Sequence, residues 1–388
     1  MAASLHVALL IETSREYARG LLRGIARYQQ EHENWSMYFE PRGLDDPPPQ
    51  WLAGWKGDGI LARINDSGMA DTIVATGIPA VDVRGALSVP GIPFVGLDNT
   101  PIAKLAYEHL RDAGLRHFAF CGTPRGENPN QDFRCDSFRR FVERDGRSCD
   151  IWLGEHLETH NATWEDQQKD LADWLGKLPK PVGIMTCHDD RGQQVLDACR
   201  RVDLTVPDQA AVISVDNDPC LCNLCTPTLT SIDVNPSRVG YAAAELLDRL
   251  MKDEKPDSMT RYLGPPRGIA ARRSTDMLAI DDQDLAAAVR YVRKYATRGI
   301  RVRDVVARAE QSPSTLERRF QKAVGRTIKA EITRVKLNRA KLLLAETDYA
   351  VGAIAERSGF AESKYFCEVF RKHVGMTALK YRRTFRDE

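Results

Sequence analysis

The chain has 388 residues, 43% of them apolar and 28% charged, and a formal net charge of +1 at pH 7. This composition is ordinary for a globular protein, and the length allows two or three domains. The first apolar run, residues 7–11, is too short to span a membrane and follows no basic stretch. It therefore argues against a membrane anchor or a secretory signal and predicts a buried strand.

Nine cysteines, an odd number, are mostly scattered along the chain. Without a signal segment, we expect reduced thiols and a cytoplasmic protein. One cluster stands out, formed by Cys220, Cys222 and Cys225. Three thiolates could begin a zinc site, but no fourth Cys or His follows at ligand spacing. We favour packing of these thiols in a loop over a metal site, and we expect no metal and no cofactor.

From residue 5 to about 263, short apolar runs alternate with amphipathic segments. The expected strands are residues 6–11, 59–64, 80–83, 94–97, 117–122, 182–187 and 211–216. The expected helices are residues 17–31, 102–113, 134–143, 164–175, 192–202 and 236–252. Such alternation predicts parallel sheets covered by helices on both faces. Because this region is large for one sheet, we expect two doubly wound lobes with a ligand cleft between them.

Polar residues follow three of these strands, where a ligand would bind. They are the stretches Glu12–Arg19, His188–Arg191 and Asp216–Asp218. Asp, Asn and Arg offer paired acceptors and fork-shaped donors for the hydroxyl groups of a polyol. Arg15 and Tyr17 are candidates only because they follow the first strand.

The segments VGLDNTPIAKLAYEHLRDAGLRHFAFCG (95–122), DDRGQQVLDACRRVDLTVPDQAAVISVDNDP (189–219) and TPTLTSIDVNPSRVGYAAAELL (226–247) resemble LacI-family effector domains. That resemblance implies a periplasmic-binding-protein fold, with lobes exchanging near residues 122, 233 and 261. It assigns effector contacts to Asp189, Asp216 and Arg134, and sugar stacking to Trp164, whereas His188 departs from the usual Asn. Plainer roles stay open: Asp189 as a helix N-cap and Trp164 as core. The full effector set is Asp189, Asp216, Arg134, Trp164, Arg191, Asn217, Arg15 and Tyr17.

Beyond Pro265 and Pro266 the pattern becomes purely helical, and the charge changes sign. Residues 281–388 hold 24 basic and 14 acidic residues, a net +10, whereas the first 280 residues carry −9. A basic tail on an acidic body predicts a polyanionic partner for the tail. Short helix, turn and second helix recur twice, at 302–324 and 351–374, which predicts two helix-turn-helix units.

The helical period assigns the two faces of each second helix. Leu316, Phe320, Val324, Phe366, Val369 and Phe370 face inward. The outward positions are the candidate DNA-binding residues: Ser314, Thr315, Glu317, Arg318, Gln321, Lys322, Ser363, Lys364, Cys367, Glu368 and Arg371.

The stretch AIAERSGFAESKYFCEVFRKHVGMT (353–377) resembles the AraC-family signature. VRDVVARAEQSPSTLERRFQKAVGRT (302–327) matches less fully, because Glu310 and Gln311 stand where small or apolar residues are usual. In that family a long helix joins the two units, and each recognition helix enters a major groove of double-stranded DNA. The resemblance covers about 100 residues.

Together the parts predict an α/β, two-lobed periplasmic-binding-protein-like effector domain at residues 1–276 and an all-α AraC-type DNA-binding domain at 277–388. This order resembles the family of xylose-operon regulators. The resemblance implies a homodimeric activator that binds D-xylose or a related monosaccharide and promoter DNA, with RNA polymerase as a further partner. A different small effector, or a sugar receptor without DNA function, is the alternative. The sequence contains no GxSxG, Walker or GxGxxG motif, and the adjacent side chains of His188, Asp189 and Asp190 cannot all converge on one point, so we expect no enzyme.

Overall fold

A computed structural model describes residues 4–33, 35–43, 46–154, 163–254, 261–276, 282–309 and 311–385. The chain divides into two compact units, Met1–Met277 and Leu278–Glu388; we had expected the division after residue 276. Glu310 lies outside the described residues. Within the described ranges, no helix is both long and apolar enough to cross a membrane.

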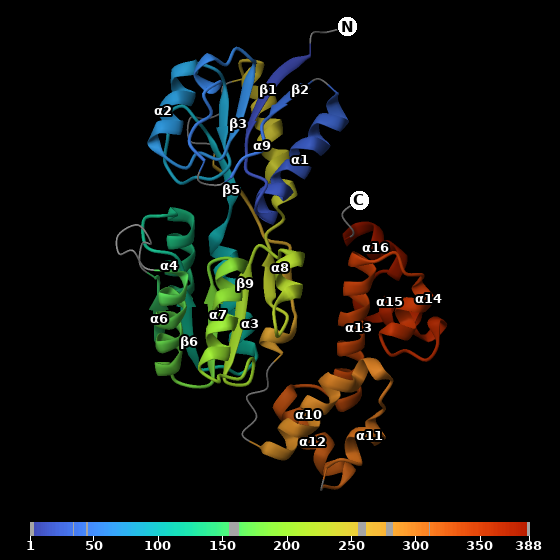
Figure 1. Ribbon diagram of the computed structural model, residues 1–388. Coiled ribbons are helices and arrows are strands. Elements are labelled where there is room, and N and C mark those ends of the chain that lie inside the picture. The colour runs from blue at the N-terminus through green and yellow to red at the C-terminus, as the bar shows by residue number, and fades with distance from the viewer. Residues whose placement is uncertain are drawn as a thin grey trace. The chain divides into compact units, whose positions relative to one another are not determined.

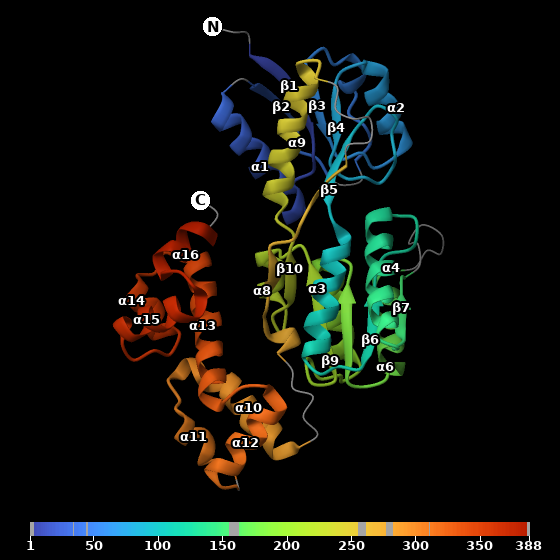
Figure 2. The same ribbon diagram turned by 180° about the vertical axis from the view of Figure 1, so that it is seen from behind.

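The first unit contains two lobes, each built on its own sheet (Figures 1 and 2). The first sheet has the strand order β11-β5-β4-β3-β1-β2, and its strand pairs are all parallel. Its strands are β1 (Leu5–Leu10), β2 (Trp35–Phe39), β3 (Gly59–Ala62), β4 (Ala80–Asp82), β5 (Phe94–Leu97) and β11 (Arg261–Gly264). Its helices are α1 (Glu16–His32), α2 (Ser67–Thr76) and α9 (Pro236–Met251).

The second sheet has the order β12-β10-β9-β8-β6-β7, and only β12 runs antiparallel to its neighbour among the described strands. Its strands are β6 (His117–Cys121), β7 (Cys149–Trp152), β8 (Val182–Thr186), β9 (Ala210–Val215), β10 (Thr230–Asp233) and β12 (Gly268–Ala270). The helices of this lobe are α3 (Asn99–Asp112), α4 (Pro129–Arg144), α6 (Trp164–Lys177), α7 (Asp189–Arg201) and α8 (Pro219–Leu224). The two-lobed, doubly wound fold expected from the alternating pattern is therefore confirmed.

The chain passes between the lobes three times. It leaves the first sheet after β5, because α3 already packs in the second lobe, so the expected exchange near residue 122 is wrong. The strand that ends at Cys121 belongs to the second sheet, so the chain has already changed lobes before residue 122. The other crossings lie between β10 and α9 and between β11 and β12.

The first lobe closes on α9, a helix far from α1 in sequence that lies beside it in both views (Figures 1 and 2). Glycines allow the close approach of the two helices. A Cβ atom at Gly24 would overlap the carbonyl oxygen of Ser237, and one at Gly240 would overlap that of Leu21. The returning chain is thereby fixed to the first lobe.

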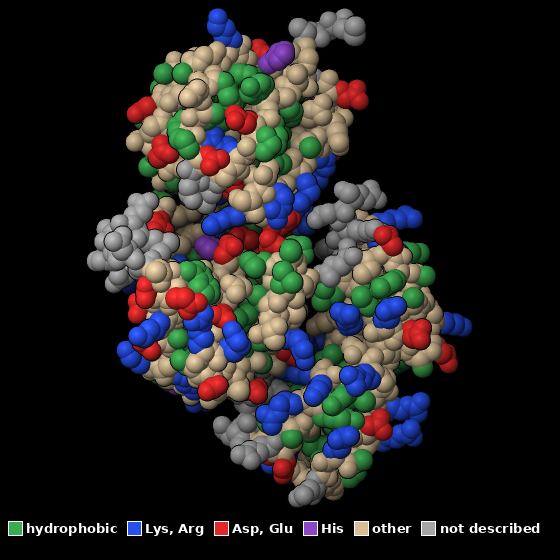
Figure 3. Space-filling view, viewed as in Figure 1, with side chains coloured by type: hydrophobic (Ala, Val, Ile, Leu, Met, Phe, Trp, Pro, Cys, Tyr) green, Lys and Arg blue, Asp and Glu red, His purple; other side chains and the backbone are tan. Residues whose placement is uncertain are grey.

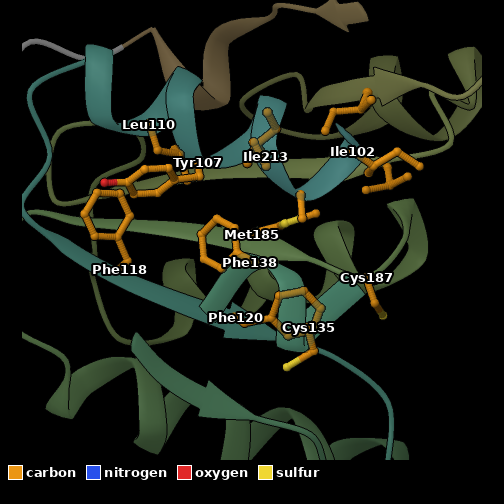
Figure 4. Close-up of a cluster of buried hydrophobic side chains, with 14 of the residues drawn as sticks. Ile102, Tyr107, Leu110, Phe118, Phe120, Cys135, Phe138, Met185, Cys187 and Ile213 are labelled. Atoms are coloured by element: carbon orange, nitrogen blue, oxygen red, sulfur yellow. The ribbon is translucent and has the colours of Figure 1, made fainter. Parts of the chain in front are cut away.

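The second lobe has its largest apolar cluster between its sheet and the helices α3 and α4 (Figure 4). Phe118, Phe120, Phe138 and Met185 are at most 1% exposed there. Sequence reasoning missed the strands β2, β7, β10, β11 and β12. Those five are short, three to five residues each, so they carry no long apolar run, and β2 and β7 also lie at sheet edges and include exposed positions.

The second unit is all helical. Its helices are α10 (Gln283–Tyr295), α11 (Val302–Val306), α12 (Pro313–Val324), α13 (Ile328–Glu346), α14 (Val351–Arg357), α15 (Ser363–Val374) and α16 (Ala378–Phe385). The pairs α11–α12 and α14–α15 are the two expected helix-turn-helix units, joined by α13. Leu316, Phe320, Phe366 and Phe370 are fully buried, as the helical period predicts.

A buried carboxylate joins the first helices of this unit. Glu331 of α13 is 0% exposed and forms ion pairs with Arg293 of α10 and with Arg326 and Arg334. Burial by itself raises the pKa of Glu331, but the arginines outweigh it and hold that pKa at about 2. The charged form is therefore part of the folded structure.

We expect Gly240→Ala to destabilise the first unit by about 1–3 kcal/mol, because the added methyl group forces α1 and α9 apart. Thermal unfolding followed by circular dichroism measures the loss. The control is Gly176→Ala in α6, where a Cβ meets nothing within 4 Å and better helix propensity offsets any loss. Equal melting temperatures for the two variants would contradict the close packing.

Glu331→Gln should destabilise the second unit by about 3–5 kcal/mol, because it leaves three arginines without their shared carboxylate. The pKa of Glu331 is lower in the folded state, so its stabilisation is present above pH 4.5 and is lost as pH falls toward 2. Urea unfolding across this pH range should show the wild type and the variant converging in acid. A constant difference in stability would contradict the assignment, and exposed Glu356→Gln is the control.

Candidate functional site

A cavity of about 600 Å³ lies between the two lobes of the first unit. Its lining includes Arg15, Tyr17 and Arg63 from the first lobe and Arg134 and Asp216 from the second. Figure 3 shows charged side chains of both signs, with a histidine, along this gap. Because parallel strands end at one edge of a sheet, residues after β1, β3, β8 and β9 meet there. The volume suits a small ligand.

Arg134 and Asp216 form the second-lobe wall. Arg134, only 5% exposed, donates from Nε to Asn99 Oδ1 at 2.9 Å and from Nη1 to the carbonyl oxygen of Cys187. Asp216 directly follows β9 with φ of 109°, a strained backbone for an L-residue. Its carboxylate makes no hydrogen bond to the described part of the chain. Burial raises the pKa of Asp216, while Arg134 opposes that rise.

The first lobe supplies a second group of charges. Arg63 forms a buried ion pair with Glu12 and lies over the ring of Tyr17 at 5.5 Å. Burial and the neighbouring Arg84 lower the pKa of Arg63 to about 9. Arg15, the N-cap residue of α1, forms no hydrogen bond or ion pair through its side chain within the described residues. Its guanidinium is therefore available to a ligand.

His188 and Arg191 complete the cavity at the start of α7. His188 is the N-cap residue, and its Nδ1 lies 3.3 Å from both the Arg191 amide nitrogen and Asp190 Oδ2. Burial opposes the charged form, but Cys187 and Asp190 outweigh it and raise the pKa of His188 to about 10. Arg191 stacks over Trp152 at 5.1 Å and donates to Gln194 at 2.7 Å.

Three candidate effector residues lie outside the cavity lining. Both carboxylate oxygens of Asp189 are used internally, because Oδ1 accepts from Ser231 at 2.6 Å and Oδ2 accepts from the Asp218 amide at 2.7 Å. Nor does Asp189 cap α7, since His188 does. Burial and Asp216 raise the pKa of Asp189 to about 7. Its placement makes it a support for the Asp216 loop.

Asn217 and Trp164, the other two candidates, do not line the cavity, for different reasons. Asn217 accepts from Arg272 through Oδ1 at 2.8 Å, which fixes the loop after β9 rather than a ligand. Trp164 is 47% exposed at the start of α6 and lies under Arg201 at 5.5 Å. It is not core, so that interpretation is wrong, and it is not among the residues that line the cavity.

Sequence reasoning missed several cavity residues. The polar ones that it did not assign are Arg63, Arg84, Asn99, Thr123, Glu127, Asn128, Asn130, Gln131, Gln167 and His188. Arg63 had been counted as part of a strand, although β3 ends at Ala62 and places it at the strand end. The strand-end rule would have found Arg63, Arg84 and Asn99. The same rule applies to the loop before α4, because this loop directly follows β6 and carries Thr123, Glu127 and Asn128.

The cysteine cluster resolves into two kinds of position. Cys222 and Cys225 are buried among the apolar residues of the second lobe, and Cys220 is exposed. Within the described ranges, no group of three or more His, Cys, Asp or Glu could hold a metal ion. The packing interpretation therefore describes Cys222 and Cys225.

The candidate DNA-binding residues are mostly on the surface of the second unit. Those exposed are Ser314, Arg318, Gln321, Lys322, Ser363, Lys364, Cys367, Glu368 and Arg371. Two of the set are engaged internally: Thr315 accepts a hydrogen bond from Ser312 at 2.9 Å, and Glu317 accepts one from the Ile328 amide at 3.3 Å. Glu317 therefore helps to fix the start of α13 rather than facing outward.

Family models match three parts of the chain. A XylR N-terminal domain matches residues 6–100, a periplasmic binding protein-like domain matches 107–275, and a helix-turn-helix domain matches 305–384. The last match spans both helix-turn-helix pairs of the second unit. A complex of the transcriptional regulator CelR with cellobiose shares the fold, with a TM-score of 0.57 at 19% identity over 71% of this chain and 86% of that chain.

Whole-length relatives give the same result. The xylose operon regulatory protein of Escherichia coli strain K12 is 32% identical over 97% of this chain and 96% of its own. That of Haemophilus influenzae is 31% identical over 97% of each. A structure of the xylose-binding transcription activator xylR matches all of both chains with a TM-score of 0.70 at 30% identity. These relatives are transcription regulators and not enzymes, and the chain belongs to the family of xylose operon regulatory proteins.

Proposed function

We propose that this regulator binds D-xylose or a related monosaccharide in the cavity between the lobes of its first unit. The observation that carries the proposal is Asp216: its carboxylate lines the cavity on a strained backbone and has no hydrogen-bond donor among the described residues. A partly buried carboxylate without a donor has lost part of its hydration without a replacement, and two neighbouring hydroxyl groups of a sugar would supply the missing hydrogen bonds. The names of the relatives suggest D-xylose as the first candidate.

Arg134 complements this acceptor with donors. Its position is fixed by Asn99 and the carbonyl oxygen of Cys187, both of which are neutral acceptors. The remaining guanidinium edge can donate to ring or hydroxyl oxygens, and Tyr17 adds a ring at the same cavity. A ligand held by both lobes favours one lobe arrangement over others, by as much as its affinity differs between them.

In the second unit, the exposed faces of α12 and α15 would enter successive major grooves of double-stranded promoter DNA. We infer that the regulator acts as a homodimer, in the cytoplasm where its DNA lies, and activates transcription through RNA polymerase. The effector would then change how two DNA-binding units are presented to their half-sites. The exposed, basic faces of α12 and α15 favour this function over that of a sugar receptor without a DNA target.

Asp216→Asn should weaken the binding of a monosaccharide by about tenfold to a hundredfold, because it removes a charged acceptor of two hydroxyl groups. Calorimetric titration of the full chain with D-xylose, and with D-glucose, L-arabinose and D-ribose, measures the change. Asp197→Asn on the outer side of α7, where Asp197 pairs with Arg200 and Arg201, is the control. Unchanged affinity in the Asp216 variant would remove this residue from the site.

Arg371→Ala should lower affinity for DNA about tenfold and reduce the salt dependence of binding by about one charge, because Arg371 is an exposed cation of α15. The probe is a duplex that the full chain itself enriches from a random-sequence pool, with binding followed by fluorescence anisotropy at several salt concentrations. Arg200→Ala in the first unit removes the same charge elsewhere. If both variants lost affinity equally, the effect would be one of net charge and not of the recognition helix.

A further inference from the structure

The cavity of the first unit carries more positive charge than a neutral sugar requires. Among the described residues, five arginines and His188 line it, but only two carboxylates, those of Asp216 and Glu127. Carboxylates that do not line the cavity neutralise part of this positive charge. Glu12 pairs with Arg63, and Asp190 lies beside His188. The net positive charge of the cavity therefore depends on which of the lining arginines lack a carboxylate partner.

Three arginines of the lining form no ion pair with a carboxylate of the described chain: Arg15, Arg134 and Arg191. The hydrogen-bond acceptors of Arg134 and Arg191 are uncharged, namely a side-chain amide and a carbonyl for Arg134 and the amide of Gln194 for Arg191. Asp216 is the carboxylate that most favours the charged form of Arg134, and it opposes the lowering of the Arg134 pKa by burial. Arg15 acts on Asp190 and Asp216 at longer range but pairs with neither, and Arg191 pairs with no carboxylate of the described chain; the two arginines come from opposite lobes.

Among these arginines, Arg191 shows the clearest lack of an anionic partner. It is 9% exposed, and its Nε is buried with no hydrogen-bond partner in the described structure. The ring of Trp152 gives it a favourable surface at 5.1 Å but no counter-charge. A buried guanidinium without an anion is costly unless a ligand supplies one, and its fork of donors suits a carboxylate or a phosphate. Arg15 lines the same cavity and forms no side-chain hydrogen bond or ion pair within the described residues, although its charge favours the ionised forms of Asp190 and Asp216.

We propose that the effector of this protein is an anionic monosaccharide, whose carboxylate or phosphate group binds Arg15 and Arg191 while its hydroxyl groups bind Asp216 and Arg134. This proposal rests on the proposed sugar-binding function: it keeps a monosaccharide in the cavity but replaces neutral D-xylose by an acidic or phosphorylated relative. In this proposal the Asp216 carboxylate accepts hydrogen bonds from hydroxyl groups of the ligand, whereas the two arginines bind its anionic group. The anion would also draw charges of both lobes together, since Arg15 and Arg191 come from opposite lobes.

Calorimetric titration of the full chain with matched compounds tests the class. The probes are D-xylose against D-xylonate and D-xylose 5-phosphate, and D-galactose against D-galacturonate. We expect at least one anionic compound to bind ten times or more tightly than its neutral partner, and its affinity to fall with added NaCl. Preference among the acids and the phosphate distinguishes a carboxylate from a phosphate source. Neutral sugars that bind as tightly as their anionic partners, or anions that do not bind at all, overturn the proposal.

The variant Arg15→Gln assigns the anion to its residue, because it breaks no internal contact. It should weaken the anionic compound about tenfold to a hundredfold and the neutral partner less than twofold. Arg23→Gln is the control: it makes the same charge change on α1, where Arg23 pairs with Glu16 outside the cavity. An equal loss for both ligands would mean that Arg15 binds the sugar hydroxyls, which contradicts the proposal. If D-xylose binds through Asp216 but no anion competes, the sugar-binding function stands and the anionic class falls.

Discussion

The effector unit depends on one constraint, which is that each parallel sheet presents the carboxyl ends of its strands to a single cavity. Arg15 after β1, Arg63 after β3, His188 after β8 and Asp216 after β9 meet there although they are far apart in sequence. The three crossings between lobes keep the two sets of strand ends opposed. The glycine contact between α1 and α9 secures one of those crossings, because it fixes the returning helix to the first lobe.

Polar residues outside the cavity lining hold the lining residues in position and leave their charged groups available to a ligand. Asp189 bonds Ser231 and the Asp218 amide, and Asn217 bonds Arg272, so the loop that carries Asp216 is anchored on both sides. That anchoring maintains the positive φ of Asp216 and leaves its carboxylate to a ligand. In the second unit, Glu331 plays a comparable structural part, since its buried charge fixes α10 against α13 near the first helix-turn-helix unit.

Much of this organisation could be predicted from the sequence, for reasons that particular residues make clear. The helical period of 3.6 residues predicted Phe366 and Phe370 inside and Arg371 outside, because the faces of a helix follow from the spacing of its own residues. The strand-end rule reached Arg15 and Asp216. It could not tell that Asp189 turns back toward Ser231, because that choice depends on β10, a strand too short to recognise. Glu317 was misplaced likewise, since its partner, the Ile328 amide, belongs to the next helix.

Hydrogen–deuterium exchange of the full chain, with and without a saturating monosaccharide effector, tests the central claim most directly. The account predicts slower exchange at strand ends of both lobes, in residues 12–17 and in residues 187–191 and 216–218, because one ligand contacts both walls of the cavity. Protection confined to one lobe, or found only outside these segments, would contradict a ligand bound between the two lobes.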